Sequence, residues 1–439
     1  MKYLILLALA LALFTTSAFA NFPEMFGASF TTSSIGNQAN MDANDPSNNF
    51  YAPSILGFSD KFNFVAQATS TAVHPKEIKN IVTANSTNSN TGTAFGEANT
   101  NYVKFYGGSL HAALPVGGLT HFGTLGLSVF LPIGDVVQTN SGHPFNPEYV
   151  MYRSRHEGTS IFLNFAKKLS DDFAFSLGTI VGFQAAAEVK TNLSLNGAAY
   201  GSWASGQAKV SPSLGAIASV TKTFDNNSLY FTYQQEMKSN LKTSVFGEIT
   251  NPSLALLDSR LDTMIYYEPH TFRLGSTFNF QDVEFYTGVE YMMWSNYKTP
   301  IMTVAKTGGV VVPSSNYEAV KIRDTINPRI GMKVNMTNRW SAMLGAQYRM
   351  TPLEGDFSGS GNSVDVNTIV GTTGLQYRMV IYGKDVHLGS SVQYHHLQSK
   401  TVVKTTGQEN GAAGQKIGAP GYELGGYIIS AALGAKFNF

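Results

Sequence analysis

The chain lacks cysteine and is poor in charged residues. None of its 439 residues is Cys, which excludes a disulfide framework and thiol chemistry. Asp, Glu, Lys and Arg together make up 13%, against about 25% in typical soluble domains. The formal net charge of +1 gives no general attraction toward nucleic acid or an anionic surface. We therefore expect no nucleic-acid partner, and the low charge argues against an ordinary soluble enzyme.

The first twenty residues carry the only long apolar run. Lys2 precedes an apolar stretch from Tyr3 to Phe14, and Ala18-Phe19-Ala20 supplies a small-x-small cleavage site. This is the pattern of a secretory signal peptide, and the stretch is short for a bilayer-spanning helix, which needs about 20 residues. We predict a signal peptide over residues 1–20 and a mature chain that starts at Asn21. A retained membrane anchor is the alternative.

Beyond residue 20, no apolar run is long enough for a membrane-spanning helix, yet Tyr (21), Phe (29) and Gly (42) are abundant. Several segments instead alternate apolar and polar residues, which is the pattern of a strand. The segment at the C-terminus is the longest example. One face carries Tyr427, Ile429, Ala431, Leu433, Ala435, Phe437 and Phe439, and the other carries Ile428, Ser430, Ala432, Gly434, Lys436 and Asn438.

The connections between these strands alternate in length. Six turn-like breaks, such as Asp225-Asn226-Asn227 and Gln281-Asp282, are separated by seven longer polar segments. This rhythm predicts about 14 strands, with short periplasmic turns, long outer loops and both termini in the periplasm. The expected fold is all-β: a membrane-spanning antiparallel barrel in the outer membrane of a Gram-negative cell. A soluble β-sandwich is the alternative, but it does not explain the rhythm of the loops.

The chain ends on an aromatic residue, Phe439, which closes an amphipathic strand. Such an end looks like the signal that outer-membrane assembly machinery reads, and we expect that machinery, together with outer-membrane lipid and lipopolysaccharide, among the partners.

Residues 21–56 do not have a strand pattern. They are rich in Gly, Asn, Asp and Pro, and such a run would not pack a core of its own. One hypothesis is a disordered periplasmic lead. The other is a plug, or hatch, folded inside the lumen of the barrel, whose polar wall would satisfy its backbone. We predict a hatch over residues 21–56 and a barrel over residues 57–439.

Several ordered motifs carry a resemblance to a known family. They are Gly36-Asn37-Gln38-Ala39-Asn40, Asn49-Phe50-Tyr51-Ala52-Pro53-Ser54, Gly126-Leu127-Ser128-Val129-Phe130-Leu131-Pro132-Ile133-Gly134, Tyr267-Glu268-Pro269-His270 and Pro328-Arg329-Ile330-Gly331. In this order the chain resembles the FadL family of outer-membrane long-chain fatty-acid transporters, which includes hydrocarbon channels. The resemblance extends over nearly the whole mature chain and implies hatch contacts at Asn49, Tyr51 and Pro53.

The resemblance implies passive transport of long-chain fatty acids or related hydrophobic compounds, with a hatch as the gate. The ligand would leave sideways through a gap beside a kink in the third strand. Pro132 has no N–H to donate to a neighbouring strand, and Gly134 permits a bend, so we assign the kink to these two residues. The alternative is that both residues lie at the outer end of the strand.

The second long loop segment is rich in large apolar side chains. It contains Phe145, Tyr149, Met151 and Tyr152, and by analogy with the family we place a ligand-binding groove there. The same residues would also suit an interfacial aromatic belt. The apolar run from Val310 to Val312 is a second candidate for a groove wall or a strand end.

Charged residues recur on predicted lumen faces. Glu284 and Glu290 share one face, and Lys321, Arg323, Arg329 and Lys333 share a face of the next strand, with Arg273, Arg339 and Arg349 beside them. Opposite charges on adjacent strands pair across a sheet. Three hypotheses for the role of these charges stay open. They could form a salt-bridged wall that holds the plug, supply a cation that binds a ligand carboxylate, or line an ion-selective pore.

The sequence does not indicate an enzyme. It contains no Gly-x-Ser-x-Gly step, and alternation sends His395 and His396 to opposite faces, which is poor geometry for a shared metal. We expect no catalytic residues, no metal and no cofactor. Two other functions stay open: a porin for polar solutes, and an adhesin or structural barrel that acts through its outer loops.

Overall fold

The protein forms a closed barrel of fourteen antiparallel strands. The computed structural model describes residues 22–84, 94–100, 102, 104–117, 122–132, 146–152, 159–193, 203–249, 257–298, 303–306, 320–358, 363–404 and 417–439. Each wall strand pairs with its neighbour in the chain order, and β1 closes the ring on β23, with Asn63 opposite Asn438. The predicted strand number is thus confirmed.

The wall strands, in order around the ring, are β1 (Asn63–Pro75), β4 (Phe105–Val116), β5 (Gly123–Pro132), β7 (Ser160–Ser170), β8 (Phe173–Leu193), β9 (Trp203–Phe224), β10 (Asn227–Gln234), β13 (His270–Phe280), β14 (Val283–Met293), β17 (Thr325–Asn335), β18 (Trp340–Arg349), β21 (Thr368–Ile381), β22 (Lys384–Val403) and β23 (Gly421–Asn438).

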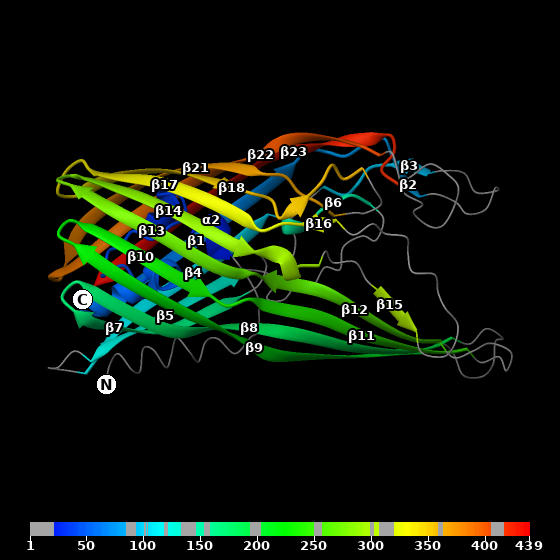
Figure 1. Ribbon diagram of the computed structural model, residues 1–439, viewed down its shortest axis with the longest axis horizontal. Helices are drawn as coiled ribbons and strands as arrows, with labels where there is room; N and C mark the ends of the chain where they lie inside the picture. The colour runs from blue at the N-terminus through cyan, green and yellow to red at the C-terminus, as the bar shows by residue number, and fades with distance from the viewer. Residues whose placement is uncertain are drawn as a thin grey trace.

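The two ends of the barrel differ, as the loop rhythm predicts. At one end, two-residue turns such as Asp225-Asn226 and Gln281-Asp282 join the strands, and the first residue of each has positive φ. This backbone twist matches that of a tight hairpin. The C-terminus lies at this end (Figure 1). The opposite end carries the long connections.

Further short elements extend the long-loop end. β11 (Met237–Ile249), β12 (Leu257–Glu268) and β15 (Thr303–Lys306) prolong the wall beyond β10, β13 and β14. Three two-stranded sheets lie among the loops: β2 (Ile81–Ala84) with β3 (Ala94–Gly96), β6 (Glu148–Tyr149) with β20 (Ser363–Val364), and β16 (Lys321–Ile322) with β19 (Leu353–Glu354). The described residues of this end also form the 3-10 helices η2 (Val150–Tyr152) and η4 (Trp294–Asn296).

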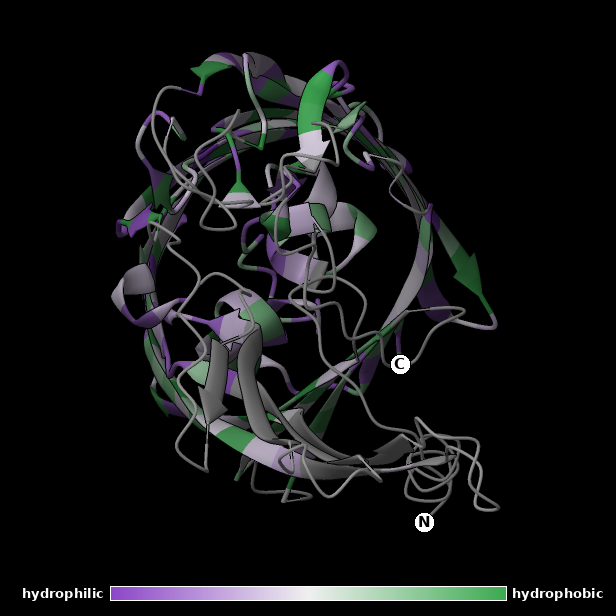
Figure 2. Ribbon diagram, turned by 90° about the vertical axis from the view of Figure 1, so that its right-hand side faces the viewer, coloured by the Kyte–Doolittle hydropathy of each residue, from purple (hydrophilic) through white to green (hydrophobic). Residues whose placement is uncertain are grey.

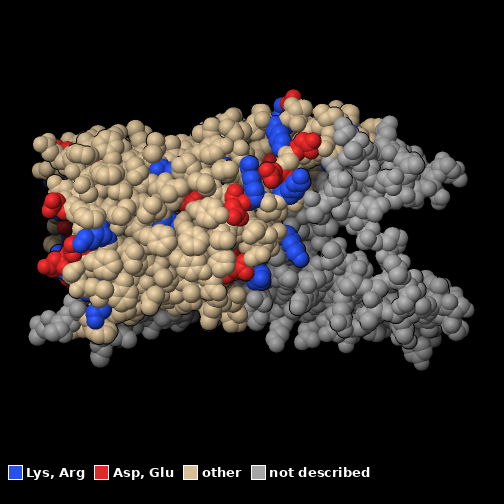
Figure 3. Space-filling model, in the orientation of Figure 1, with Lys and Arg blue, Asp and Glu red and all other residues tan. Residues whose placement is uncertain are grey.

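The outer face of the wall is apolar and the inner face is polar. On β23, Leu433 is 69% exposed on the outside, whereas Ser430 and Lys436 are buried on the inside. Figure 3 shows a broad band of the outer surface with few charged side chains, and the charges gather toward the two ends of this band. Alternation along each strand places the apolar set outward, as a barrel in lipid requires. Among the described residues, no helix is long and apolar enough to cross a membrane.

The N-terminal segment folds inside the ring of strands. It contains α2 (Phe22–Phe26), α3 (Phe30–Ser34), α4 (Asn48–Tyr51) and η1 (Pro53–Phe58), and Figure 2, which looks along the barrel, shows helices within the ring. Nearly all of its residues are buried. We call residues 22–58 the plug. The plug continues to Phe58 and β1 begins at Asn63.

A lysine on the outer face should weaken the barrel in lipid. Leu433 lies opposite Ala68, near the middle of β1. We expect Leu433→Lys to lower the free energy of unfolding in lipid vesicles by about 2–4 kcal/mol, because a cation near the bilayer midplane is poorly solvated. Tyr382→Lys, at a fully exposed turn position, is the control and should change stability little. Equal effects of the two variants in urea titrations would contradict a lipid-facing band.

Candidate functional site

The plug is a polar segment that satisfies its own backbone locally. Ser29 caps α3 through a reciprocal pair of hydrogen bonds with Thr32. In the loop before α4, the side chains of Asn40, Asp42 and Asp45 accept from backbone N–H groups two residues farther on. Such local bonds replace a helix or sheet ladder. The run of Asn, Asp and Ser therefore folds without an apolar core of its own.

Glycines of the wall form the seats in which the plug rests. A Cβ at Gly126 would lie 2.2 Å from the Asn49 Oδ1 atom, and one at Gly345 would lie 2.3 Å from the backbone N of Gly36. A Cβ at Gly389 would meet the ring of Phe30 at 2.1 Å. No side chain fits at these distances, so the plug approaches the wall more closely than any other residue type would allow.

Asn49 lies in the seat at Gly126. Its Nδ2 donates to Ser128 Oγ at 3.0 Å and to the Phe162 carbonyl at 3.2 Å. Asn164 Nδ2 donates in turn to Asn49 Oδ1 at 2.9 Å. Gly126, Asn164 and Gly178 are paired across β5, β7 and β8. The wall beneath Asn49 is therefore built from two glycines and one amide.

The other two predicted hatch residues hold the plug together rather than to the wall. Tyr51 is fully buried and its hydroxyl donates to the Pro23 carbonyl at 2.8 Å. Pro53 is the first residue of η1, a position where its missing N–H costs nothing. The next residue, Ser54, reaches the wall, with Oγ 2.8 Å from Ser219 Oγ and 2.6 Å from Thr221 Oγ1.

A buried charge cluster anchors the plug on the other side. Glu290 lies between two guanidinium groups, at 2.6 Å from Arg273 Nε and 2.5 Å from Arg329 Nη2. Arg329 also donates to the carbonyl of Asn37 in the plug, and Arg273 stacks over the ring of Phe50 with 4.6 Å to the centroid. The excess positive charge of the trio is directed at the plug. The predicted pairing of charges across the wall is present, and Lys333 with Glu284 at 2.8 Å is a second pair.

An aromatic cluster joins the plug to β5 and β7. Phe50 of the plug meets Phe162 edge-on at 5.1 Å and Phe130 at 6.0 Å between centroids. The β5–β7 ladder ends at Phe130 opposite Ser160, whereas β4 follows β5 as far as Pro132. Pro132 is the last residue of β5 that the structure describes, and the assignment of the kink to it stays a prediction. Gly134 lies outside the described residues.

An apolar groove of about 320 Å³ runs over the outer face of the same strands. Leu125 of β5, Leu163 of β7 and Leu177 of β8 line it and are about half exposed. Gly126 and Gly178, which seat the Asn49 region on the inside, contribute backbone to its floor. One thin part of the wall therefore has the plug on its inner side and an apolar groove on its outer side.

The predicted groove residues lie inside the barrel mouth. Tyr149 and Met151 are fully buried and Tyr152 is 6% exposed, so the reading as an interfacial aromatic belt is wrong for these three. Tyr149 Oη accepts from the N–H of Gly425, a β23 residue with positive φ, at 2.8 Å, and Tyr152 Oη lies 3.1 Å from Thr368 Oγ1. They form an inner closure of the mouth, and the ligand-binding groove assigned to them stays a prediction. Phe145 and the Val310–Val312 run lie outside the described residues.

This closure contacts the plug through a cation. The Arg349 guanidinium lies over the Tyr152 ring at 5.9 Å to the centroid, and its Nε is 3.8 Å from Glu24 Oε1 of α2. Met25, Phe26, Tyr149 and Met151 belong to one buried apolar cluster. The alternation of apolar and polar residues predicts which face of a strand points into the lumen. It does not predict contacts between an outer loop and the plug, because these two segments meet only in the folded barrel.

The tip of the plug is tied to the last strand. Lys436 Nζ lies 2.8 Å from Asp42 Oδ2, and the Asp42 side chain stays 43% exposed. Burial raises the pKa of the Asp42 carboxyl, but the Lys436 ammonium and the Asn44 N–H outweigh burial and lower this pKa to about 2. The carboxylate is therefore ionised at all physiological pH values.

No cluster of three or more potential metal ligands occurs among the residues that the structure describes. His395 is buried within the lumen, with Nε2 3.1 Å from Gln393 Oε1 and its ring 5.6 Å from that of Phe26. It packs against the plug and forms part of its seat.

Removing the carboxylate from the charge cluster should loosen the plug. In Glu290→Gln, two buried guanidinium groups lose their counter-ion, so we expect a loss of about 3–5 kcal/mol of stability and a rise in ion conductance of bilayers that hold the barrel. Glu284→Gln is the matched control. Its partner Lys333 is partly exposed, and the cost should be about 1 kcal/mol or less. Equal conductance of both variants would argue against an anchoring role.

The tip contact predicts a specific acid sensitivity. Because the pKa of Asp42 is lower in the folded protein than its ordinary value of 3.8, its contribution is fully present above about pH 4 and disappears as the pH falls toward 2. In urea titrations the wild-type protein should exceed Asp42→Asn at pH 6 and equal it near pH 2. Asp60→Asn, at an exposed position, should show no such convergence. A constant difference across this range would overturn the assignment.

No family model matches the chain, and no curated protein matches it in sequence. Solved structures do resemble it. A FadL homologue from Pseudomonas aeruginosa superposes with a TM-score of 0.60 at 14% identity, over 96% of this chain and 98% of that one. The toluene transporter TodX of P. putida gives 0.51 at 12% identity, over 97% and 99%. The monoaromatic hydrocarbon channel CymD gives 0.50 at 11% identity, over 96% and 99%. The chain therefore has the barrel fold of the FadL homologue and these two hydrocarbon transporters.

Proposed function

We propose that the protein lets hydrophobic compounds cross the outer membrane of a Gram-negative cell by passive diffusion, as a member of the FadL family. Long-chain fatty acids and hydrocarbons are the candidate ligands. The observation that carries the proposal is the arrangement at β5 and β7. Here the plug, an aromatic cluster, the end of a strand ladder and an apolar outer groove all adjoin one part of the wall.

The side chains inside the barrel favour a hydrophobic ligand over a polar one. The plug lies within the ring of strands (Figure 2), and Met25 and Phe26 of the plug share one buried apolar cluster with Tyr149 and Met151 of the outer loops. A porin requires a continuous aqueous path, whereas here a ligand would have to displace apolar side chains. Such a displacement favours a molecule that replaces the lost apolar contacts.

Sideways exit has a physical basis in β5. Beyond Phe130 the ladder to β7 ends, and Pro132 has no N–H with which to extend it. A ligand that passes Phe50, Phe130 and Phe162 would reach this end of the ladder from inside. The apolar groove over Leu125, Leu163 and Leu177 would receive it on the lipid side. The polar contacts of Asn49 would hold the plug as the gate.

The comparisons add support for this class of function. Two of the three similar structures carry names that refer to toluene or monoaromatic hydrocarbons, and the third is named a FadL homologue. The names of TodX and CymD describe a transporter and a channel. The apolar outer band and the paired strands are what an outer-membrane location requires.

Uptake by whole cells tests transport and exit together. The protein would be produced in a Gram-negative host that lacks its own fatty-acid channel, and uptake of labelled oleate and labelled toluene would be measured. We expect at least one probe to enter several-fold faster than in cells without the protein. A folded surface barrel that raises the uptake of neither probe would overturn the proposed transport.

A reversible staple then tests the exit route. The chain has no native cysteine, and Leu131 and Thr159 follow the last β5–β7 pair, Phe130 with Ser160. Oxidation of Leu131→Cys/Thr159→Cys should reduce uptake by tenfold or more, and a reductant should restore it. Leu375→Cys/Ser390→Cys, across β21 and β22, is the matched control and should be insensitive. Full uptake with the first pair oxidised would mean that the ligand passes the plug into the periplasm.

A further inference from the structure

A second cavity lies at the outer ends of β17, β18, β21 and β22, apart from the proposed exit. Its volume is about 240 Å³, several times the ~30 Å³ that one water molecule occupies. It is smaller than the ~300 Å³ at which pockets for drug-sized ligands begin. The cavity therefore suits a compact molecule or a single ring, and it is too small for a long acyl chain.

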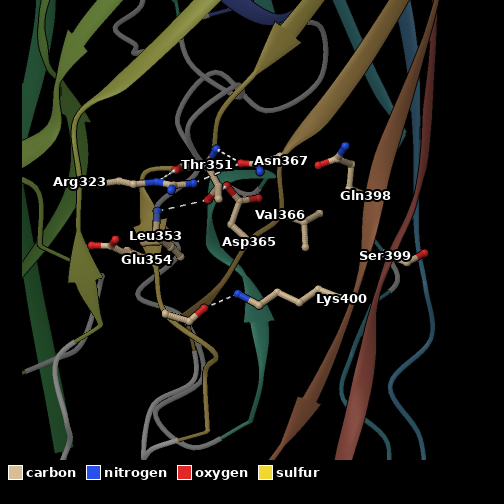
Figure 4. A pocket seen from close by; sticks show the side chains of 11 residues that line it. Arg323, Thr351, Leu353, Glu354, Asp365, Val366, Asn367, Gln398, Ser399 and Lys400 are labelled. Atoms are coloured by element: carbon tan, nitrogen blue, oxygen red, sulfur yellow. Dashed lines mark hydrogen bonds between the residues drawn. The ribbon is translucent and has the colours of Figure 1, made fainter.

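Polar groups of both signs line this cavity. Figure 4 shows Arg323 and Glu354 on one side, Asp365 in the middle, and Gln398 and Lys400 on the other. Arg323 Nε donates to the Thr351 carbonyl at 3.1 Å, and Lys400 donates to the Gly355 carbonyl. Both cations thus hydrogen-bond to neutral oxygen atoms in the part of the chain that the structure describes.

The carboxylate in the middle of the cavity is held in place by its neighbours. Thr351 Oγ1 donates to Asp365 Oδ2 at 2.6 Å, and the Thr351 N–H donates to Asn367 Oδ1 at 3.0 Å. Asp365 and Thr351 are more than nine-tenths buried. The Asp365 carboxylate and the Asn367 amide are therefore held in position before a ligand binds, which lowers the entropic cost of binding.

The interleaved charges exclude simple ions. A carboxylate or phosphate placed between Arg323 and Lys400 would face the Asp365 carboxylate, and a cation at Asp365 would face both basic groups. Like charges in such proximity discriminate strongly against a ligand. Asp365 lies between Arg323 and Lys400 (Figure 4), so hydrogen-bond acceptors and donors follow one another over a short distance. A neutral ligand with many groups that both donate and accept remains.

Sugar hydroxyls have this property, since each donates one hydrogen bond and accepts others. The floor of the cavity is supplied by Leu353 and Val366, which belong to the buried apolar cluster of the mouth. The C–H face of a sugar ring can pack on such a floor. We propose that this cavity binds a single sugar ring.

Two sources could present that chemistry at the outer mouth: the core sugars of lipopolysaccharide, and free sugars in the medium. The proposed ligand class does not depend on the transport proposal. Only binding to the sugars of lipopolysaccharide requires that the protein lies in the outer membrane. Because sugar binding is measured on purified protein, its result is independent of whether the protein transports hydrophobic compounds.

The test is saturation-transfer NMR with the purified full-length barrel in nanodiscs. Glucose, galactose and a heptose would be the free probes. Lipopolysaccharide with a complete core and deep-rough lipopolysaccharide without an outer core would be compared by titration. We expect saturable binding of a free sugar or of the complete core, weakened tenfold or more in both Asp365→Asn and Gln398→Ala. Asp385→Asn, in an exposed ion pair with Arg378 at the other end of the barrel, is the control for folding and should bind normally.

Each other outcome overturns the proposal. Equal binding of complete and deep-rough lipopolysaccharide, with no free sugar bound, would place recognition on lipid or phosphate. Competition by inorganic phosphate or acetate would make the cavity an anion site. Unchanged binding in Asp365→Asn and Gln398→Ala, with the variants folded, would place the sugar elsewhere. Binding of no probe at all would leave the cavity without a sugar.

Discussion

The structure depends on the fit between a polar plug and the inner wall of the barrel. Inside a lumen, every buried N–H and C=O group needs a partner, and a segment rich in Asn, Asp and Ser has too little apolar surface to fold by itself. The wall supplies what is missing. Glycines allow backbone and side chains to approach, Asn49 bonds to Ser128 and Phe162, and Arg329 caps the Asn37 carbonyl. Plug and barrel therefore specify each other.

The two ways of holding the plug have different consequences for movement. On the side of β13, β14 and β17, the trio of Arg273, Glu290 and Arg329 is buried and expensive to break. On the side of β5 and β7, the contacts are amide hydrogen bonds and aromatic edges, which exchange partners at lower cost. A plug held in this way would yield first on the β5 side, where the outer groove lies.

The outer mouth combines two surfaces of opposite character. The segment from Tyr149 to Tyr152 packs into an apolar cluster that reaches the plug. The cavity above Leu353 and Val366 is instead lined by charged and amide groups of both signs. An apolar cluster and a polar cavity at one mouth suit two different ligands better than one. A hydrocarbon in the polar cavity would remove water from its charged groups without replacing the lost hydrogen bonds.

The sequence by itself determined the all-β class, the fourteen strands, the faces of β23 and the pairing of lumen charges. Each of these follows from local rules: a strand alternates with period two, and a tight hairpin needs turn residues. Residues 22–58 lie within the ring of strands (Figure 2), and their role as a hatch stays a prediction. Only the tertiary structure decided that Tyr149, Met151 and Tyr152 turn inward, and that Phe50 meets Phe130 and Phe162. These contacts join residues far apart in the chain, and closure of the ring, rather than any local pattern, brings them together.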